Sequence, residues 1–100
     1  MYGTVARMKV KAGKMNDFIA NMTQQQAGRD MGGYLGEIVY KMDSNPNEVM
    51  LCVFFADKEA YQKNANDPQM AKDYEQYRAM LDADPEWNDG EVIHQNWVKK

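Results

Sequence analysis

The segment Glu48–Phe55 reads EVMLCVFF and is the longest apolar run of the chain. Successive side chains of a β-strand point to opposite faces, and in this segment both sets are hydrophobic. A strand with one face in water alternates apolar with polar residues instead. The segment therefore predicts a central strand that is covered on both faces. Because a chain of 100 residues has little material for two covering layers, we expect a partner subunit to supply one of them.

The length and the charge of the chain limit the classes of protein to which it can belong. One hundred residues fit a single domain over residues 1–100, with a core large enough to fold without disulfides or a structural metal ion. The formal net charge of -3 argues against a nucleic-acid-binding surface, which needs a basic stripe. No stretch approaches the roughly 20 apolar residues of a membrane span, and no signal-peptide pattern is visible. We therefore expect a cytoplasmic protein that binds neither nucleic acid nor membrane.

The cysteine and histidine content limits the chemistry further. A single cysteine, Cys52, excludes an internal disulfide and a thiolate metal cluster. Cys52 lies within the apolar run, where a free cysteine usually behaves as a small hydrophobic residue. No metal-ligand spacing, glycine-rich phosphate loop or nucleophile-base pair is recognisable in the sequence. We therefore expect no metal site.

Hydrophobic periodicity predicts a strand and a helix at the start of the chain. Residues 2–10 alternate between two sets of side chains, one of them mainly apolar, as in a half-buried strand. A helix follows, because apolar residues then recur at i, i+3, i+4 and i+7. These residues are Met15, Phe18, Ile19 and Met22. We expect Gly28 to end this helix, since glycine readily adopts the left-handed conformation of a helix stop.

A second alternation predicts a hairpin around the apolar run. Residues 34–42 alternate in the manner of a strand, and the turn-forming residues 43–47 separate them from Glu48–Phe55. Two strands that are joined by so short a connection pair in the antiparallel direction. We therefore expect an antiparallel hairpin with a five-residue loop.

Two short helices and a strand are predicted for the second half of the chain. Asp57 is a favourable N-cap for a helix that runs from residue 58 to about residue 66. Pro68 is tolerated in a first helical turn and begins the next helix, and residues 84–85, Asp-Pro, end the helical run. Residues 90–98 alternate once more and predict the last strand.

The predicted order is strand, helix, strand, strand, helix pair, strand. It is the split β-α-β order of the ferredoxin-like class, an α+β fold in which a four-stranded antiparallel sheet carries its helices on one face. The other face, including half of the central strand, is then left without cover. An exposed apolar patch of that size is normally a protein interface, and most soluble oligomers are homo-oligomers. We therefore expect a homodimer through the open sheet face.

Three stretches of the sequence follow a family pattern. Gly13 lies between the first strand and the first helix, FFADKEAYQKNANDP follows the central strand, and LDADPEWNDGEVI precedes the last strand. With these features the chain resembles the antibiotic biosynthesis monooxygenase (ABM) family of dimeric α+β barrels over nearly its whole length. The resemblance implies a dimeric α+β barrel with a pocket between sheet and helices in each subunit.

The resemblance also implies an oxidation that needs no cofactor. Characterised relatives oxidise electron-rich phenols, quinols or polyketide anthrones with dioxygen, without added flavin or metal. A haem-degrading branch carries Asn, Trp and His at three positions that fall here on Ala6, Asn64 and Tyr74, and none of the three matches. Haem degradation is therefore not expected. The polyketide branch binds its phenol or carbonyl through Asn, Trp and Arg side chains, and Asn64 offers a comparable amide.

The candidate site consists of one histidine, one asparagine and a set of tyrosines and methionines. His94, the only histidine, suits the role of general base in proton removal from a phenol, although an interface histidine on a strand has the same pattern. Asn64 and Tyr74 are the expected orienting residues. The expected substrate-binding wall consists of Tyr61, Tyr77, Met70 and Met22. The alternative for the stripe of Met70, Tyr74, Tyr77 and Leu81 is ordinary helix core.

The positions of three charged residues can also be predicted from the elements in which they lie. We expect Asp73 and Glu75 to lie on a solvated helix face. Arg7, in the middle of the first strand, is expected to pair across the dimer with an acid such as Glu37.

Two functions of different class agree with these features. The first is a cofactor-independent monooxygenase that oxidises a quinol or polycyclic phenol with dioxygen, in a dry pocket that orients and deprotonates the substrate. The second is a non-catalytic dimeric protein that binds a small aromatic molecule, or a stress-related protein without turnover, which needs only the pocket. Family resemblance favours the first, and the unmatched positions favour the second.

Overall fold

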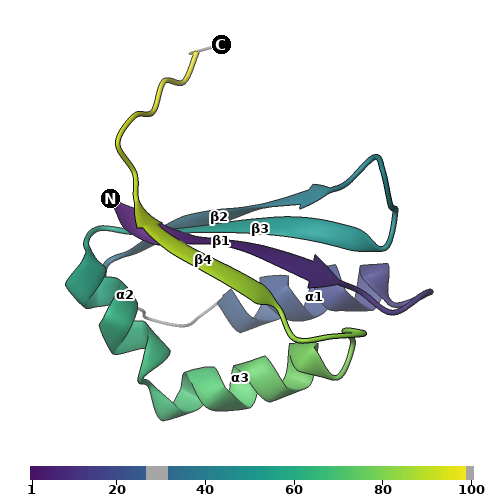
Figure 1. Ribbon diagram of the computed structural model, residues 1–100. Helices are drawn as coiled ribbons and strands as arrows, with labels where there is room; N and C mark the ends of the chain where they lie inside the picture. The colour runs from purple at the N-terminus through teal and green to yellow at the C-terminus, as the bar shows by residue number, and fades with distance from the viewer. Residues whose placement is uncertain (27–31, 99–100) are drawn as a thin grey trace.

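The computed structural model describes residues 1–26 and 32–98, and Figure 1 shows its seven elements. The expected helix stop at Gly28 lies outside these residues. The elements are, in chain order, β1 (Tyr2–Lys9), α1 (Met15–Gln26), β2 (Tyr34–Lys41), β3 (Glu48–Phe55), α2 (Lys58–Ala65), α3 (Pro68–Arg78) and β4 (Glu86–Glu91). No helix among the described residues is long and apolar enough to cross a membrane.

The four strands form one antiparallel sheet in the order β2-β3-β1-β4. All three helices lie on the same side of this sheet (Figure 1). The ferredoxin-like α+β fold that the sequence predicts is therefore confirmed. Within the single chain the sheet is open, with β2 and β4 as its two edges, and it does not close into a barrel.

Strand β3 lies inside the sheet, between β2 and β1, as its apolar sequence predicts. Its helix-facing side chains Val49, Leu51 and Phe55 are buried. The side chains of the opposite set, Met50, Cys52 and Phe54, remain half-buried because none of the described residues packs over that face. We call this uncovered side of the sheet the open face.

Two aspartates fix the helix starts in the second half of the chain. The Asp57 carboxylate accepts a hydrogen bond from the Ala60 N–H at the start of α2, at 2.8 Å. The Asp67 carboxylate accepts one from the Gln69 N–H, and Pro68 occupies the first turn of α3. Both predicted helix starts are thereby confirmed. Helix α3 ends at Arg78, where Ala79 is the C-cap.

The predicted last strand over residues 90–98 is wrong. Strand β4 covers Glu86–Glu91 instead and pairs with β1 until Glu91 stands opposite Tyr2. Because β1 begins at Tyr2, none of the described strands runs beside residues 92–98, and these residues adopt no regular structure. An alternating sequence specifies side-chain faces, but a strand also needs a backbone to pair with.

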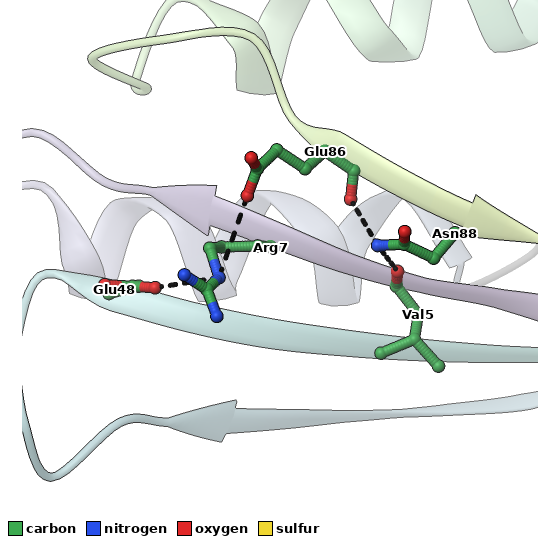
Figure 2. A network of polar contacts seen from close by, with 5 residues as sticks. All are labelled: Val5, Arg7, Glu48, Glu86 and Asn88. Atoms are coloured by element: carbon green, nitrogen blue, oxygen red, sulfur yellow. Dashed lines mark hydrogen bonds and ion pairs between the residues drawn. The ribbon is translucent and has the colours of Figure 1, made fainter.

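Arg7 lies on the open face and binds two acids of its own chain, as Figure 2 shows. Its Nε atom is 3.1 Å from Oε1 of Glu48 and 3.7 Å from Oε2 of Glu86. The expected partner Glu37 stands opposite Val53 on the helix-facing side of the sheet. The expectation of an Arg7 to Glu37 pair is therefore replaced by pairing between neighbouring strands.

Candidate functional site

A cavity of about 420 Å³ lies between the helix-facing side of the sheet and the three helices. Six of the seven sequence-predicted site residues line it: Met22, Tyr61, Asn64, Met70, Tyr74 and Tyr77. The other lining residues are Thr4, Gln25, Tyr34, Glu37, Leu51, Val53, Phe55, Ala65, Ala71, Asp73 and Trp87. Every helix and every strand contributes at least one side chain, so the complete fold is needed to form the cavity.

Tyrosine and phenylalanine rings form much of the cavity wall. The ring of Tyr61 meets that of Phe55 edge to face, with centroids 5.6 Å apart. Tyr74 and Tyr77 meet at 5.2 Å with an interplanar angle of 90°. These arrangements are favourable for aromatic pairs and hold the rings in defined orientations. The wall can therefore receive a flat aromatic molecule.

The hydroxyl of Tyr61 donates a hydrogen bond to Asp89 Oδ1 on β4, at 2.7 Å. Burial and the neighbouring Asp89 carboxylate raise the pKa of Tyr61 to about 12, against a smaller opposite effect of the nearby Thr4 hydroxyl. The Thr4 hydroxyl is itself buried and meets no group in hydrogen-bond geometry. Tyr61 therefore stays protonated at neutral pH and serves as a hydrogen-bonding group.

A second tyrosine and carboxylate lie together on the β2 side of the cavity. The Tyr34 hydroxyl donates to Glu37 Oε1 at 2.8 Å. Burial, together with the Glu37 carboxylate, raises the pKa of Tyr34 well above its usual value. Glu37 therefore places a carboxylate at the cavity wall, on a strand where the apolar residues around it gave no sign of a site.

Asp73 lies against the cavity and not on the solvated helix face that we expected. It is only 6% exposed, and its Oδ1 accepts a hydrogen bond from Gln69 Nε2 at 3.0 Å. Gln25 from α1 donates to the Asp73 backbone carbonyl, also at 3.0 Å. Glu75 is exposed, as predicted. The prediction for Asp73 was wrong because α1 packs on α3 and covers a helix face whose residues are polar in the sequence.

Asn64 and Tyr77 face the cavity from two different helices. The amide of Asn64 lies 3.8 Å from the Met70 sulfur and so stands beside the α3 wall. Tyr77 belongs to the buried core as well as to the cavity wall, and burial raises its pKa far above the usual value, with Tyr74 and Asp73 adding to the effect. Tyr77 therefore belongs to the helix core and also lines the cavity.

His94 is the one predicted site residue that lies outside the cavity. It belongs to the exposed segment that follows β4 and does not line the cavity. Its expected position depended on the strand over residues 90–98, which does not form. Cys52 also lies away from the cavity, on the open face, and burial raises the pKa of its thiol.

The cavity offers hydrogen-bonding groups, carboxylates and aromatic faces. Among the described residues, no group of three or more His, Cys, Asp or Glu side chains is arranged to hold a metal ion. Thr4, Gln25, Tyr34, Glu37 and Trp87 were missed by the sequence reasoning. Strand alternation could have placed Thr4 on the covered face of β1 with the buried Ala6 and Met8, but it does not show which residues of other strands meet Thr4 at a cavity.

Comparison with known proteins gives one family and a set of similar folds. The model of the family described as antibiotic biosynthesis monooxygenase matches residues 1–80. A search among curated proteins gave no match.

Three solved structures illustrate the shared fold. A variant of SnoaB, a cofactor-independent oxygenase from Streptomyces nogalater, superposes with a TM-score of 0.79 at 14% identity over 94% of each chain. A candidate antibiotic biosynthesis monooxygenase from Bordetella bronchiseptica gives 0.80 at 14% identity, over 93% of this chain and 97% of the other. A conserved protein from Methanosarcina mazei Go1 gives 0.76 at 18% identity over 89% of each chain. At these identities the likeness establishes the architecture.

Proposed function

The chain belongs to the antibiotic biosynthesis monooxygenase family, and from this premise we propose that it is a cofactor-independent monooxygenase of quinols or polycyclic phenols. The observation that carries the proposal is the cavity of about 420 Å³, whose aromatic walls carry a few polar groups. Such a site suits a flat, electron-rich molecule with oxygen substituents. The catalytic unit is proposed to be one domain over residues 1–100.

The proposed reaction uses the substrate as its own reductant. A phenol with an oxidisable ring C–H takes up one molecule of dioxygen, one oxygen atom becomes the new quinone carbonyl, and the other leaves as water. The ring supplies the four electrons that reduce dioxygen, so the equation balances without a cofactor. The protein contributes orientation, proton removal and exclusion of water.

The roles of the cavity residues follow from their chemistry. Asn64 and Tyr74 are the proposed orienting groups, because an amide and a phenol can hold a substrate oxygen. Tyr61, Tyr77, Met70 and Met22 are the proposed binding wall. A proton acceptor must lie at the cavity, and the carboxylate of Glu37 on its sheet wall is our choice in place of His94.

Oxygen uptake by the purified protein tests this proposal. We expect uptake above the autoxidation background with at least one member of a panel of hydroquinones, naphthols and anthrones, with water and quinone as products. Tyr74→Phe, which keeps the ring but removes the hydroxyl, should reduce this uptake. A wild-type rate equal to the background across the whole panel argues against a monooxygenase.

A second candidate function is the binding of a small aromatic molecule without turnover. The position of the only histidine outside the cavity favours it. In that case an aromatic dye should bind saturably and be displaced by phenols, while oxygen uptake stays at the background. Dye binding accompanied by turnover would exclude this alternative.

We also propose that the protein acts as a homodimer through the open face. Met50, Cys52 and Phe54 remain half-buried there, and Val5 is 42% exposed beside them. A second copy that packs on this face would complete the cover that the sequence of β3 predicts. Sedimentation equilibrium should give a dimer at micromolar concentration, and a monomer under those conditions would contradict the proposal.

A further inference from the structure

The side chain of Thr4 is a buried polar group in the cavity wall whose hydroxyl has no hydrogen-bond partner. Thr4 is 5% exposed, and no described group meets its Oγ1 atom in hydrogen-bond geometry. The residue lies on the helix-covered side of β1 and lines the cavity. Buried hydroxyls normally have a partner, because an unsatisfied one has lost its bonds to water without replacement. A molecule bound in the cavity can supply the partner that the fold does not.

The groups beside Thr4 form one polar corner of the cavity. Asp89 stands opposite Thr4 in the ladder of β1 and β4, and its carboxylate accepts the proton of the Tyr61 hydroxyl at 2.7 Å. Because this proton is directed at Asp89, the Tyr61 oxygen keeps lone pairs for another donor. The Thr4 hydroxyl is close enough to Tyr61 to oppose in part the rise in the Tyr61 pKa that burial and Asp89 cause. Thr4 and Tyr61 thus offer a donor and an acceptor together, and we call them the hydroxyl subsite.

Trp87 supplies an aromatic surface near the hydroxyl subsite. It precedes Asp89 by two residues on β4, so both side chains lie on the same side of the strand, and Trp87 lines the cavity. Its side chain is 43% exposed and makes no ring contact with another aromatic residue in the described part of the chain. A bound aromatic ring can therefore contact Trp87 while its oxygen substituent reaches Thr4.

The hydroxyl subsite lies on the other side of the cavity floor from the proposed proton acceptor. Val53 stands opposite Thr4 in one ladder and opposite Glu37 in the other. Two strand spacings, roughly 10 Å, therefore separate the backbones of Thr4 and Glu37. Thr4 is placed to hold a ligand, and proton removal stays with Glu37.

We propose that Thr4 is a ligand-binding residue that, together with Tyr61, holds an un-ionised hydroxyl group of an aromatic ligand whose ring lies against Trp87. The ligand oxygen accepts the Thr4 proton, and the ligand proton is donated to the Tyr61 oxygen. An ionised phenol has no proton for Tyr61, and the Asp89 carboxylate repels its charge. The inference rests on the cavity as the binding site of the proposed function and does not depend on turnover.

Calorimetric titration with two probes of similar shape tests this hydrogen bond. One probe is 2-naphthol, and the other is 2-fluoronaphthalene, whose fluorine cannot donate a proton. Thr4→Val keeps the shape of the side chain but removes its hydroxyl, and should raise the dissociation constant of 2-naphthol roughly three- to tenfold, as for the loss of one hydrogen bond. The constant of 2-fluoronaphthalene should change less than about twofold, and Thr4→Ser should restore most of the 2-naphthol affinity.

The control Thr23→Val makes the same chemical change on α1, where the hydroxyl donates to the Ile19 carbonyl and does not line the cavity. It should leave the binding of both probes unchanged. Equal losses for the two probes in Thr4→Val, or no loss for either, overturn the inference. A wild type that binds neither probe overturns it together with the cavity as their binding site. The expected binding pattern with oxygen uptake at the background contradicts the monooxygenase alone.

The stability of the protein without ligand gives an independent test. Because the Thr4 hydroxyl has no partner within the described fold, Thr4→Val should unfold at the same urea concentration as the wild type or at a higher one. Thr23→Val loses a hydrogen bond of 2.9 Å and should unfold at the same concentration or a lower one. A clearly lower midpoint for Thr4→Val would mean that the fold already satisfies this hydroxyl, and the inference would be overturned.

Discussion

The hydroxyl of Tyr61 on α2 donates a hydrogen bond of 2.7 Å to the carboxylate of Asp89 on β4. The bond joins a helix to an edge strand whose six residues are all exposed. Asp89 stands opposite Thr4 in the ladder, so its side chain points to the helix-covered side of the sheet. The contact therefore attaches β4 to α2 beside the cavity.

Loss of this hydrogen bond should weaken the fold modestly. Tyr61→Phe removes the donor but keeps the ring contacts with Tyr2 and Phe55. We expect the free energy of unfolding to fall by about 0.5–1.5 kcal/mol, the usual net value of one hydrogen bond. Urea denaturation measures this change, with Tyr40→Phe at an exposed position of β2 as the control. Equal stability of Tyr61→Phe and the wild type would show that the bond contributes nothing.

Alkaline pH should remove the contribution of Tyr61 to stability. Its pKa is about 12 in the folded protein, above the value near 10 of an unfolded chain. A raised folded pKa means that the contribution is complete below pH about 10 and is lost as pH rises from 10 through 12. Unfolding measured between pH 8 and 11 should therefore show a smaller alkaline decline for Tyr61→Phe. An identical decline in both proteins would be inconsistent with the raised pKa.

Two neighbouring residues of α1 should differ sharply in their effect on stability. Phe18 is fully buried and meets Tyr77 edge to face, whereas Ile19 is 38% exposed. Phe18→Ala should cost about 3–5 kcal/mol through lost burial and a cavity. Ile19→Ala should cost about 1 kcal/mol or less, since surface substitutions change stability little. Thermal and urea unfolding compare the two, and similar losses would contradict the assigned orientation of α1.

Proton removal should depend on the cavity carboxylate and not on the histidine. If the protein oxidises phenols, Glu37→Gln should lower kcat/KM at least tenfold, about 1.4 kcal/mol of transition-state stabilisation. His94→Ala should stay within about twofold of the wild type, because His94 does not line the cavity. Oxygen-uptake kinetics with the best phenol measure both variants. The reverse order of effects would return the role of general base to His94.

The thiol of Cys52 should report on the open face. Burial raises its pKa, so the reactive thiolate is scarce and alkylation by iodoacetamide at pH 8 should be slower than that of free cysteine. If a second copy covers this face, dilution below the dimer dissociation constant should accelerate the alkylation. A rate that does not depend on protein concentration would indicate that Cys52 is not at the subunit interface.

Local sequence patterns were sufficient for most of the secondary structure. The apolar faces of β3 predicted a strand inside the sheet, and Asp57 and Asp67 with Pro68 marked the starts of two helices. These features succeed because a cap, a turn or a side-chain alternation acts over a few residues. The order of elements then restricted the fold to the ferredoxin-like class.

Site residues on one helical stripe were predictable, whereas those on separate strands were not. Met70, Tyr74 and Tyr77 share a face of α3 by spacing alone, and all three line the cavity. Glu37 and Thr4 join them only because β2 and β1 place their inner faces under the same helices. The separation of these residues along the sequence does not show that their side chains line the same cavity.

The sequence alone determined the types of the elements, their order and the interior position of β3. Only the tertiary structure decided that the last strand ends at Glu91, that Asp73 is buried and that His94 lies outside the cavity. The physical reason is that alternation and helical spacing are local properties of the chain. Strand length and burial depend instead on which distant segment lies alongside, and β4 ends at Glu91 because its partner Tyr2 is the first residue of β1.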